Sequence, residues 1–169
     1  SVGRLFDAVS SLLGLSNISN FEGQSAMKLE FVIDTKEKSF YKFLIRERGK
    51  FIIDWEEIIK GILEDIYFGV DRSTISGKFH NTLSQIILNI AERLNEQRIV
   101  LSGGCFQNVY LTETTISLLE SNNFKVYLHQ RVPPNDGGIS LGQIAARNIS
   151  HKEFILRDYH RITDNPINN

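Results

Sequence analysis

Two adjacent glycines between a short apolar run and a helical segment are the first feature that could do chemistry. The run Arg98–Leu101 is β-branched or aliphatic and too short for a helix, so it predicts a buried strand that ends at Ser102. Gly103 and Gly104 follow, and residues without a Cβ let the backbone turn sharply and a ligand approach closely. A helix beginning near Phe106 would direct unpaired N–H groups at that space, which is typical of a phosphate cradle. A tight connection without a ligand explains the same residues.

A second glycine pair closes the strongest turn signal in the chain, Pro133–Gly138. Asp136 stands directly before these glycines, and its carboxylate is a ligand that hard cations prefer, so it is a candidate to hold a cation that also binds phosphates. The alternative is that Asp136 or Asn135 caps the helix expected from Ile139. Asn108, in the first turn of the earlier helix, either hydrogen-bonds a ligand or faces water.

Other polar residues carry weaker signals. Asp7 and Glu22 adjoin glycine-bearing segments and could bind a ribose diol, although an exposed helix face explains them equally well. Cys105 stands near a predicted helix N-terminus, which can lower a thiol pKa, but no histidine is close in sequence and we interpret it as a small apolar residue. The four histidines are scattered without metal-ligand spacing, and we interpret each as a surface or packing residue: His80, His129, His151 and His160.

The elements around the glycine pairs alternate between strand and helix. Strands are predicted over 98–101 and 124–128, each followed by a glycine turn and then by a helix, over 109–119 and 139–146. Such alternation indicates a mostly parallel sheet, whose loops gather at the carboxyl edge of the strands. The two glycine turns are therefore expected to be neighbours.

The first half of the chain is mainly helical in pattern. Residues 21–30 open a helix, whereas 31–33 suit a strand equally well, and 34–39 read as a loop. The remaining predicted elements are a helix over 4–13 ended by Gly14, a hairpin of 40–45 with 50–53, helices over 55–68 and 71–94, and a polar tail from 150.

Composition excludes several classes of function. The 169 residues are 41% hydrophobic and 23% charged, which is typical of a globular protein that folds as one domain. With 19 basic and 20 acidic side chains, the chain has no general field that would attract nucleic acid or a membrane surface. No apolar run approaches the roughly 20 residues of a membrane span. A single cysteine and the lack of a secretory pattern favour the cytoplasm.

Four segments together resemble the HypF-type carbamoyltransferases. They are GRLFDAV (3–9), FEGQSAMKLE (21–30), LSGGCFQN (101–108) and VPPNDGGISLGQ (132–143). The resemblance implies an α/β fold, namely one lobe of an actin/Hsp70-like ATPase fold of the ribonuclease H type, with a mixed sheet and nucleotide held between two lobes. Residues 1–149 would form the C-terminal lobe of the carbamoyltransferase domain, and 150–169 a polar tail.

The resemblance also implies an activity. HypF proteins use carbamoyl phosphate and ATP to make carbamoyl adenylate, and then carbamoylate the C-terminal cysteine of HypE during [NiFe]-hydrogenase maturation. By the same resemblance, Gly103 and Gly104 would face the nucleotide phosphates and Asn108 would contact the nucleotide. Asp7 would lie near the ribose, and Asp136 would be a ligand of a divalent metal.

The chain departs from the family pattern in what it lacks. The family's H-x-x-x-H metal pair is absent, as are the upstream acylphosphatase-like, zinc-binding and adenylate-forming domains. We therefore expect half a site, inactive by itself, whose partners are the N-terminal lobe of the same protein and a HypE-like acceptor. The alternatives are a non-catalytic nucleotide-binding or interaction lobe, and a fragment of a tRNA threonylcarbamoyl transferase.

Overall fold

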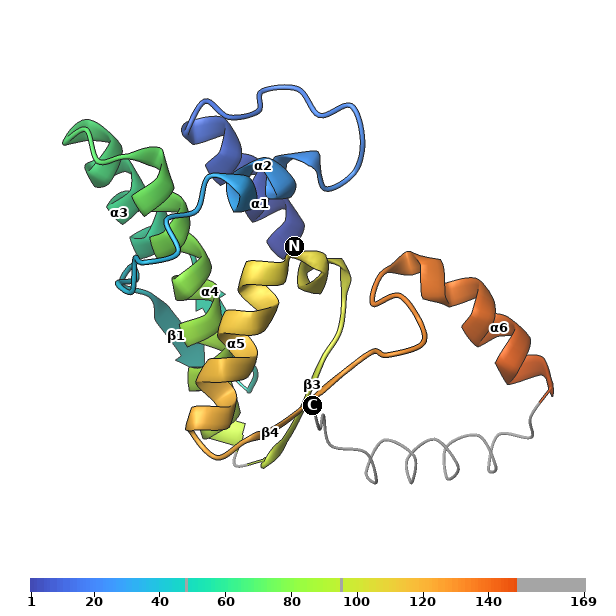
Figure 1. Cartoon of the computed structure of the whole chain (residues 1–169). Helices are drawn as coiled ribbons and strands as arrows, with labels where there is room; N and C mark the ends of the chain where they lie inside the picture. The colour runs from blue at the N-terminus through green and yellow to red at the C-terminus, as the bar shows by residue number, and fades with distance from the viewer. Residues whose placement is uncertain (48, 95, 149–169) are drawn as a thin grey trace.

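The structure, a computed structural model, describes residues 1–47, 49–94 and 96–148 (Figure 1). The expected polar tail from 150 lies outside them. The helices are α1 (Val2–Leu12), α2 (Gln24–Phe31), α3 (Glu56–Tyr67), α4 (Arg72–Leu94), α5 (Val109–Ser121) and α6 (Ile139–Asn148). The strands are β1 (Leu44–Glu47), β2 (Phe51–Asp54), β3 (Arg98–Leu101) and β4 (Lys125–Leu128), and two short 3-10 turns are η1 (Gly104–Gln107) and η2 (Asp136–Gly138). The described fold is thus mixed α/β, but the expectation of one mixed sheet is wrong for the described residues, because β1–β2 and β3–β4 form two separate two-stranded sheets.

Apolar side chains three and four residues apart produce the helical part of the core. Phe6, Val9 and Leu13 share one face of the α1 segment and are all buried. Gly14 ends α1 with a positive φ of 66°, a conformation that costs glycine little, so the predicted stop is confirmed. Helices α1, α2, α3 and α4 enclose one apolar cluster, to which α4 contributes Ile75 and Phe79.

The hairpin is confirmed, but its first strand begins later than predicted. Strands β1 and β2 pair antiparallel, with Leu44 opposite Asp54. Residues 40–43 are not a strand because Tyr41 is buried and its N–H donates to Thr82 Oγ1 of α4, 2.9 Å away, rather than to a neighbouring strand. The strand alternative for 31–33 is wrong: α2 continues through Phe31, and Ile33 N–H donates to the Glu30 carbonyl.

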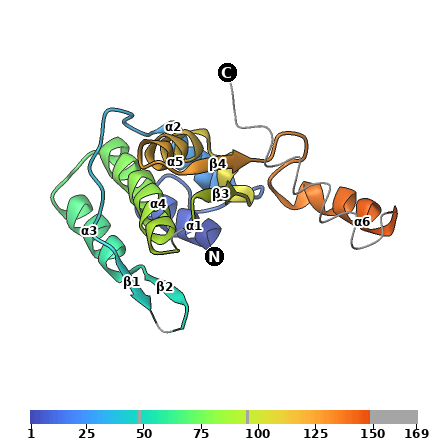
Figure 2. The ribbon, with the colours of Figure 1, turned by 90° about the horizontal axis from the view of Figure 1, so that it is seen from below.

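A parallel strand pair supports the second half of the described chain. Strands β3 and β4 run parallel, with Arg98 opposite Lys125 and Leu101 opposite Leu128, as the alternation predicts. Leu101 and Val126 are buried in a second apolar cluster with Leu119 of α5. Helix α6 stands away from the other helices in both views (Figures 1 and 2). No helix in the described ranges is long and apolar enough to cross a membrane.

Candidate nucleotide site

A cavity of about 660 Å³ opens where α1, α2 and the two glycine turns meet. Of the predicted site residues, Asp7, Gly104, Asn108 and Asp136 line it, although the chain separates the first from the last by more than a hundred positions. Glu22 and Cys105 line the same cavity. The structure therefore brings together four of the five residues that the resemblance places around one nucleotide.

The two glycine turns are joined by a backbone hydrogen bond. Gly103 N–H donates to the Pro134 carbonyl at 2.9 Å, so the prediction that the turns are neighbours is confirmed. Gly103 has a φ of 105°, which favours glycine, but it does not line the cavity and its N–H is already used. Gly104 lines the cavity, and the nearest atom to a Cβ built on it would be Asn135 Cβ at 3.9 Å. Of the pair, Gly104 is the one positioned to meet a ligand there.

The start of α5 differs from the predicted cradle. A 3-10 turn, η1, occupies Gly104–Gln107, and the α-helix begins only at Val109. Its first N–H groups are taken within the protein: the Glu30 carboxylate of α2 accepts from Val109 N–H at 2.6 Å and from Tyr110 N–H at 3.1 Å. The helix predicted over 109–119 is confirmed, but its first N–H groups are not the free donors of a phosphate cradle, because a carboxylate already satisfies that positive helix end.

Asn108 is the N-cap of α5. Its Oδ1 accepts from Leu111 N–H at 2.8 Å, and the residue is buried, so the alternative that it faces water is wrong. Its Nδ2 lies 3.0 Å from Nε2 of His80 in α4. An amide nitrogen has two hydrogens, so the contact with His80 leaves one for a ligand in the cavity that Asn108 lines.

The cap of the second glycine turn is Asn135. Its Oδ1 accepts from Gly137 N–H at 3.0 Å, and Asn135 is the N-cap of η2. Of the two predicted caps, Asn135 is therefore confirmed, at the start of η2, which runs directly into α6. In the ranges that the structure describes, the exposed Asp136 carboxylate makes no hydrogen bond or ion pair, which leaves both of its oxygens for a ligand.

Cys105 and the described histidines are not reactive centres in this arrangement. Burial raises the pKa of the half-buried Cys105 thiol, and the side chain packs against the first apolar cluster, as predicted. His80 is fully buried among aromatic rings, and burial lowers its pKa to about 4. His129 is exposed, and its Nε2 lies 2.8 Å from Ser102 Oγ at the edge of the β3–β4 pair.

The cavity is electrostatically unsuited to phosphates unless a cation is present. Carboxylates of Asp7, Glu22, Glu30 and Asp136 line it, against one arginine, Arg4. Grouped carboxylates repel an anion at short range, whereas a divalent cation between them and a phosphate would reverse that sign. Within the described residues, no three His, Cys, Asp or Glu side chains are grouped to hold a metal ion. The residues fit a cation only as a partial set, with Asp136 as one ligand.

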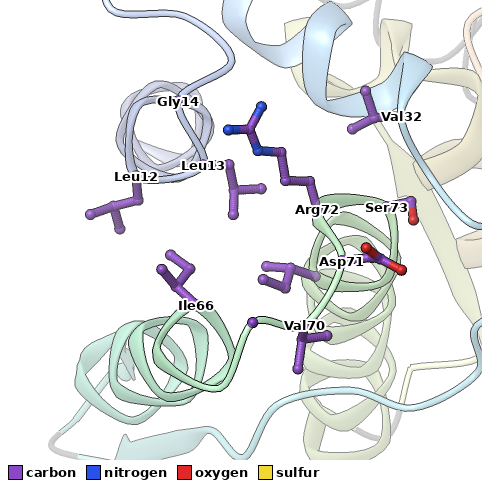
Figure 3. A pocket seen from close by; sticks show the side chains of 11 residues that line it. Leu12, Leu13, Gly14, Val32, Ile66, Val70, Asp71, Arg72 and Ser73 are labelled. Atoms are coloured by element: carbon purple, nitrogen blue, oxygen red, sulfur yellow. The ribbon is translucent and has the colours of Figure 1, made fainter.

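A second cavity of about 670 Å³ lies elsewhere, between the C-terminal ends of α1 and α3 and the start of α4 (Figure 3). Leucine, isoleucine and valine side chains form most of its wall, and Arg72 lies beside Gly14 at its edge. None of the sequence-predicted site residues lines this cavity.

Comparison with known proteins agrees with the sequence blocks. Residues 1–143 match the family described as "Carbamoyltransferase, Kae1-like Domain, second subdomain". The carbamoyltransferase HypF of Synechocystis sp. is 39% identical over 160 residues, which cover 92% of this chain and 20% of that protein. The crystal structure of full-length HypF in its phosphate- and nucleotide-bound form matches with a TM-score of 0.79 at 42% identity, covering 85% of this chain and 19% of that one. The crystal structure of T. kodakarensis HypF matches with a TM-score of 0.69 at 29% identity and the same coverage.

The chain belongs to the HypF carbamoyltransferase family. It spans about a fifth of the length of the HypF proteins that it matches. Sequence reasoning did not identify two polar residues at this candidate site, Glu30 and His80. The capping role of Asn108 did leave a signal in the sequence, since an asparagine directly before a helical segment is typical of an N-cap.

Proposed function

We propose that this chain is one lobe of an actin/Hsp70-like transferase domain and holds the nucleotide part of carbamoyl adenylate in the cavity between α1, α2 and the glycine turns. The observation that carries the proposal is the convergence of Asp7, Gly104, Asn108 and Asp136 on that one cavity. The related HypF whose crystal structure is described as phosphate- and nucleotide-bound supports it, at 42% identity. The location proposed for this function is the cytoplasm.

Each residue has a proposed task that suits its chemistry. Gly104 presents backbone without a side chain, so phosphate oxygens can approach η1 closely. The free amide hydrogen of Asn108 donates to the nucleotide, and the Asp7 carboxylate accepts from ribose hydroxyls. Asp136 would hold a divalent cation, which when bound neutralises phosphate charge and polarises the carbamoyl donor. The remaining metal ligands are proposed to come from the N-terminal lobe.

The transfer itself requires a thiolate from elsewhere. In the proposed reaction the C-terminal cysteine thiolate of a HypE-like acceptor attacks the carbamoyl carbon, a C–S bond forms, and the bond from that carbon to the AMP phosphate oxygen breaks. AMP leaves with the electron pair. Cys105 is not the acceptor because its raised pKa and its packing keep it a thiol. The task of this lobe is to hold the leaving AMP while the acceptor approaches.

Calorimetric titration of the chain with ATP and Mg²⁺ tests the proposal. Gly104→Val fills the space above η1, and its own Cβ meets nothing nearer than 3.9 Å, so the variant is expected to fold. Asp136→Ala removes the proposed metal ligand. The control is Glu120→Ala, which removes the same charge from an exposed position at the far end of α5.

The proposal predicts that Gly104→Val abolishes binding, that Asp136→Ala weakens it only when Mg²⁺ is present, and that Glu120→Ala leaves it unchanged. Equal affinity in all four proteins would place the nucleotide elsewhere. A folded wild-type chain that does not bind would refute nucleotide binding by this lobe alone and favour a non-catalytic interaction lobe.

A further inference from the structure

His80 lies behind the cavity, in the middle of α4, with none of its surface exposed. Its ring packs edge to face against the rings of Phe6, Phe79 and Tyr110, with centroid distances of 5.4, 5.7 and 5.8 Å. A phenylalanine would satisfy this packing. The imidazole nitrogens therefore call for a separate explanation.

Both nitrogens of His80 are used, and their partners fix the tautomer. Nδ1 lies 2.8 Å from the Ser76 carbonyl oxygen, which can only accept, so Nδ1 carries the hydrogen. Nε2 of the neutral ring is then an acceptor, and the Asn108 Nδ2 group donates to it at 3.0 Å. Burial favours the neutral ring because the charged form would be desolvated.

Asn108 is thus held at two points. Leu111 N–H bonds its oxygen and His80 bonds its nitrogen, at 2.8 and 3.0 Å. One hydrogen bond leaves an amide free to rotate about the bond to Cβ, whereas two bonds to opposite ends fix its plane. The second amide hydrogen consequently has one direction relative to the cavity that Asn108 lines.

We propose that His80 is a positioning residue for the nucleotide site: by accepting from Asn108 Nδ2, it fixes the direction in which the other Asn108 amide hydrogen meets the ligand. The inference rests on the proposed function of the cavity and adds a residue that cannot itself reach a ligand. A histidine that served packing alone would affect the stability of the chain and leave nucleotide affinity unchanged.

Two amide substitutions separate these roles. In His80→Gln, the longer side chain places its carbonyl oxygen near the original Nε2, so the acceptor for Asn108 is retained. In His80→Asn, the shorter side chain reaches only the original Nδ1 position, so the bond to Ser76 can form and the acceptor is lost. Both variants bury one amide, which makes their packing defects comparable. Asn108→Ser retains a helix-capping oxygen and removes the amide nitrogen.

The measurement is the affinity of the chain for ATP with Mg²⁺ by calorimetry, on variants whose folding is verified by circular dichroism. We expect His80→Gln to stay within about threefold of the wild type and His80→Asn to bind at least about tenfold more weakly, the effect of one well-made hydrogen bond. The double variant His80→Asn with Asn108→Ser should bind no more weakly than Asn108→Ser alone, since His80 acts through Asn108.

Wild-type affinity in His80→Asn would overturn the inference, and so would a double variant whose loss is the product of the two single losses. An NMR coupling between Asn108 Nδ2 and His80 Nε2 provides a readout without nucleotide, and its absence in the wild type would refute the geometry. If the coupling is present and the wild type does not bind ATP, the proposed nucleotide function fails, and the positioning role fails with it. That result differs from the one in which the wild type binds ATP and the substitutions of His80 leave the affinity unchanged.

Discussion

Replacing Glu30 by alanine should destabilise the chain without touching its apolar core. Glu30 Oε1 accepts from Val109 N–H and Tyr110 N–H, at 2.6 and 3.1 Å, and so fastens α2 to the first turn of α5. Loss of a helix-capping acceptor costs about 0.5–2 kcal/mol. Loss of a negative charge at a helix N-terminus costs about 0.3–1 kcal/mol more. Val109 is largely exposed, so water can reach the freed donors. We therefore expect the free energy of unfolding to fall by about 1.5–2 kcal/mol, near the middle of the sum of these two ranges.

Urea unfolding followed by circular dichroism measures this change. Glu30→Gln keeps an oxygen acceptor and loses only the charge, so its free energy of unfolding should be about 0.5 kcal/mol below that of the wild type. Added salt should reduce this difference in free energy, because it screens the charge. Glu120→Ala, at the exposed far end of α5, should leave the free energy of unfolding unchanged or slightly raised. A Glu30→Ala protein within about 0.5 kcal/mol of the wild type would show that these two bonds add nothing beyond hydration of the donors.

Three further predictions concern packing and protonation. Gly61→Ala should lower the free energy of unfolding by about 1–2 kcal/mol, because the new Cβ would lie 2.7 Å from the buried Tyr41 ring. In the same denaturation assay the control Gly3→Ala should not lower it, because no atom lies within 4 Å of the Cβ added there. Because the folded pKa of His80 is about 4 and the unfolded value about 6.5, the unfolded state binds more protons between them; stability should fall as pH drops from 6.5 to 4, and less steeply in His80→Gln. Cys105 should react with iodoacetamide at pH 8 more slowly than a free cysteine, since burial raises its pKa and lowers its thiolate fraction, as mass spectrometry over time would show; a rate equal to that of free cysteine would contradict its burial.

Local sequence pattern predicts the helices and the parallel strands of this chain well. Ile58 and Ile62 lie one turn apart and are both buried in α3, and the glycine at position 14 ends α1 where predicted. Such features depend on neighbours within a few positions, so the order of residues is enough to indicate them. The rule that parallel strands share a carboxyl edge also predicts that the two glycine turns are neighbours, whereas Asp7 is placed at the same site only by the resemblance of its block to the family.

The polar framework of the site could not be predicted in this way. Glu30 is 79 positions before Val109, and His80 is 28 positions before Asn108, and neither pair has a characteristic spacing. Tyr41 is not in the strand predicted for it because its N–H bonds to Thr82, which lies 41 positions away in the sequence. Hydrogen bonds between distant segments follow from how helices pack, which periodicity alone does not specify.

Helix α4 belongs to both apolar clusters. Phe79 packs in the first with α1, and Leu88 in the second beside β3 and β4. Between them, Ser84 Oγ lies 2.9 Å from Thr115 Oγ1 of α5, so the junction of the two clusters is itself closed by a buried bond. Because α4 spans both clusters, opening either cluster removes the packing of one half of this helix. We therefore expect the two clusters to unfold together, and the backbone amides in the middle of α4 to exchange with solvent only at the rate of global unfolding.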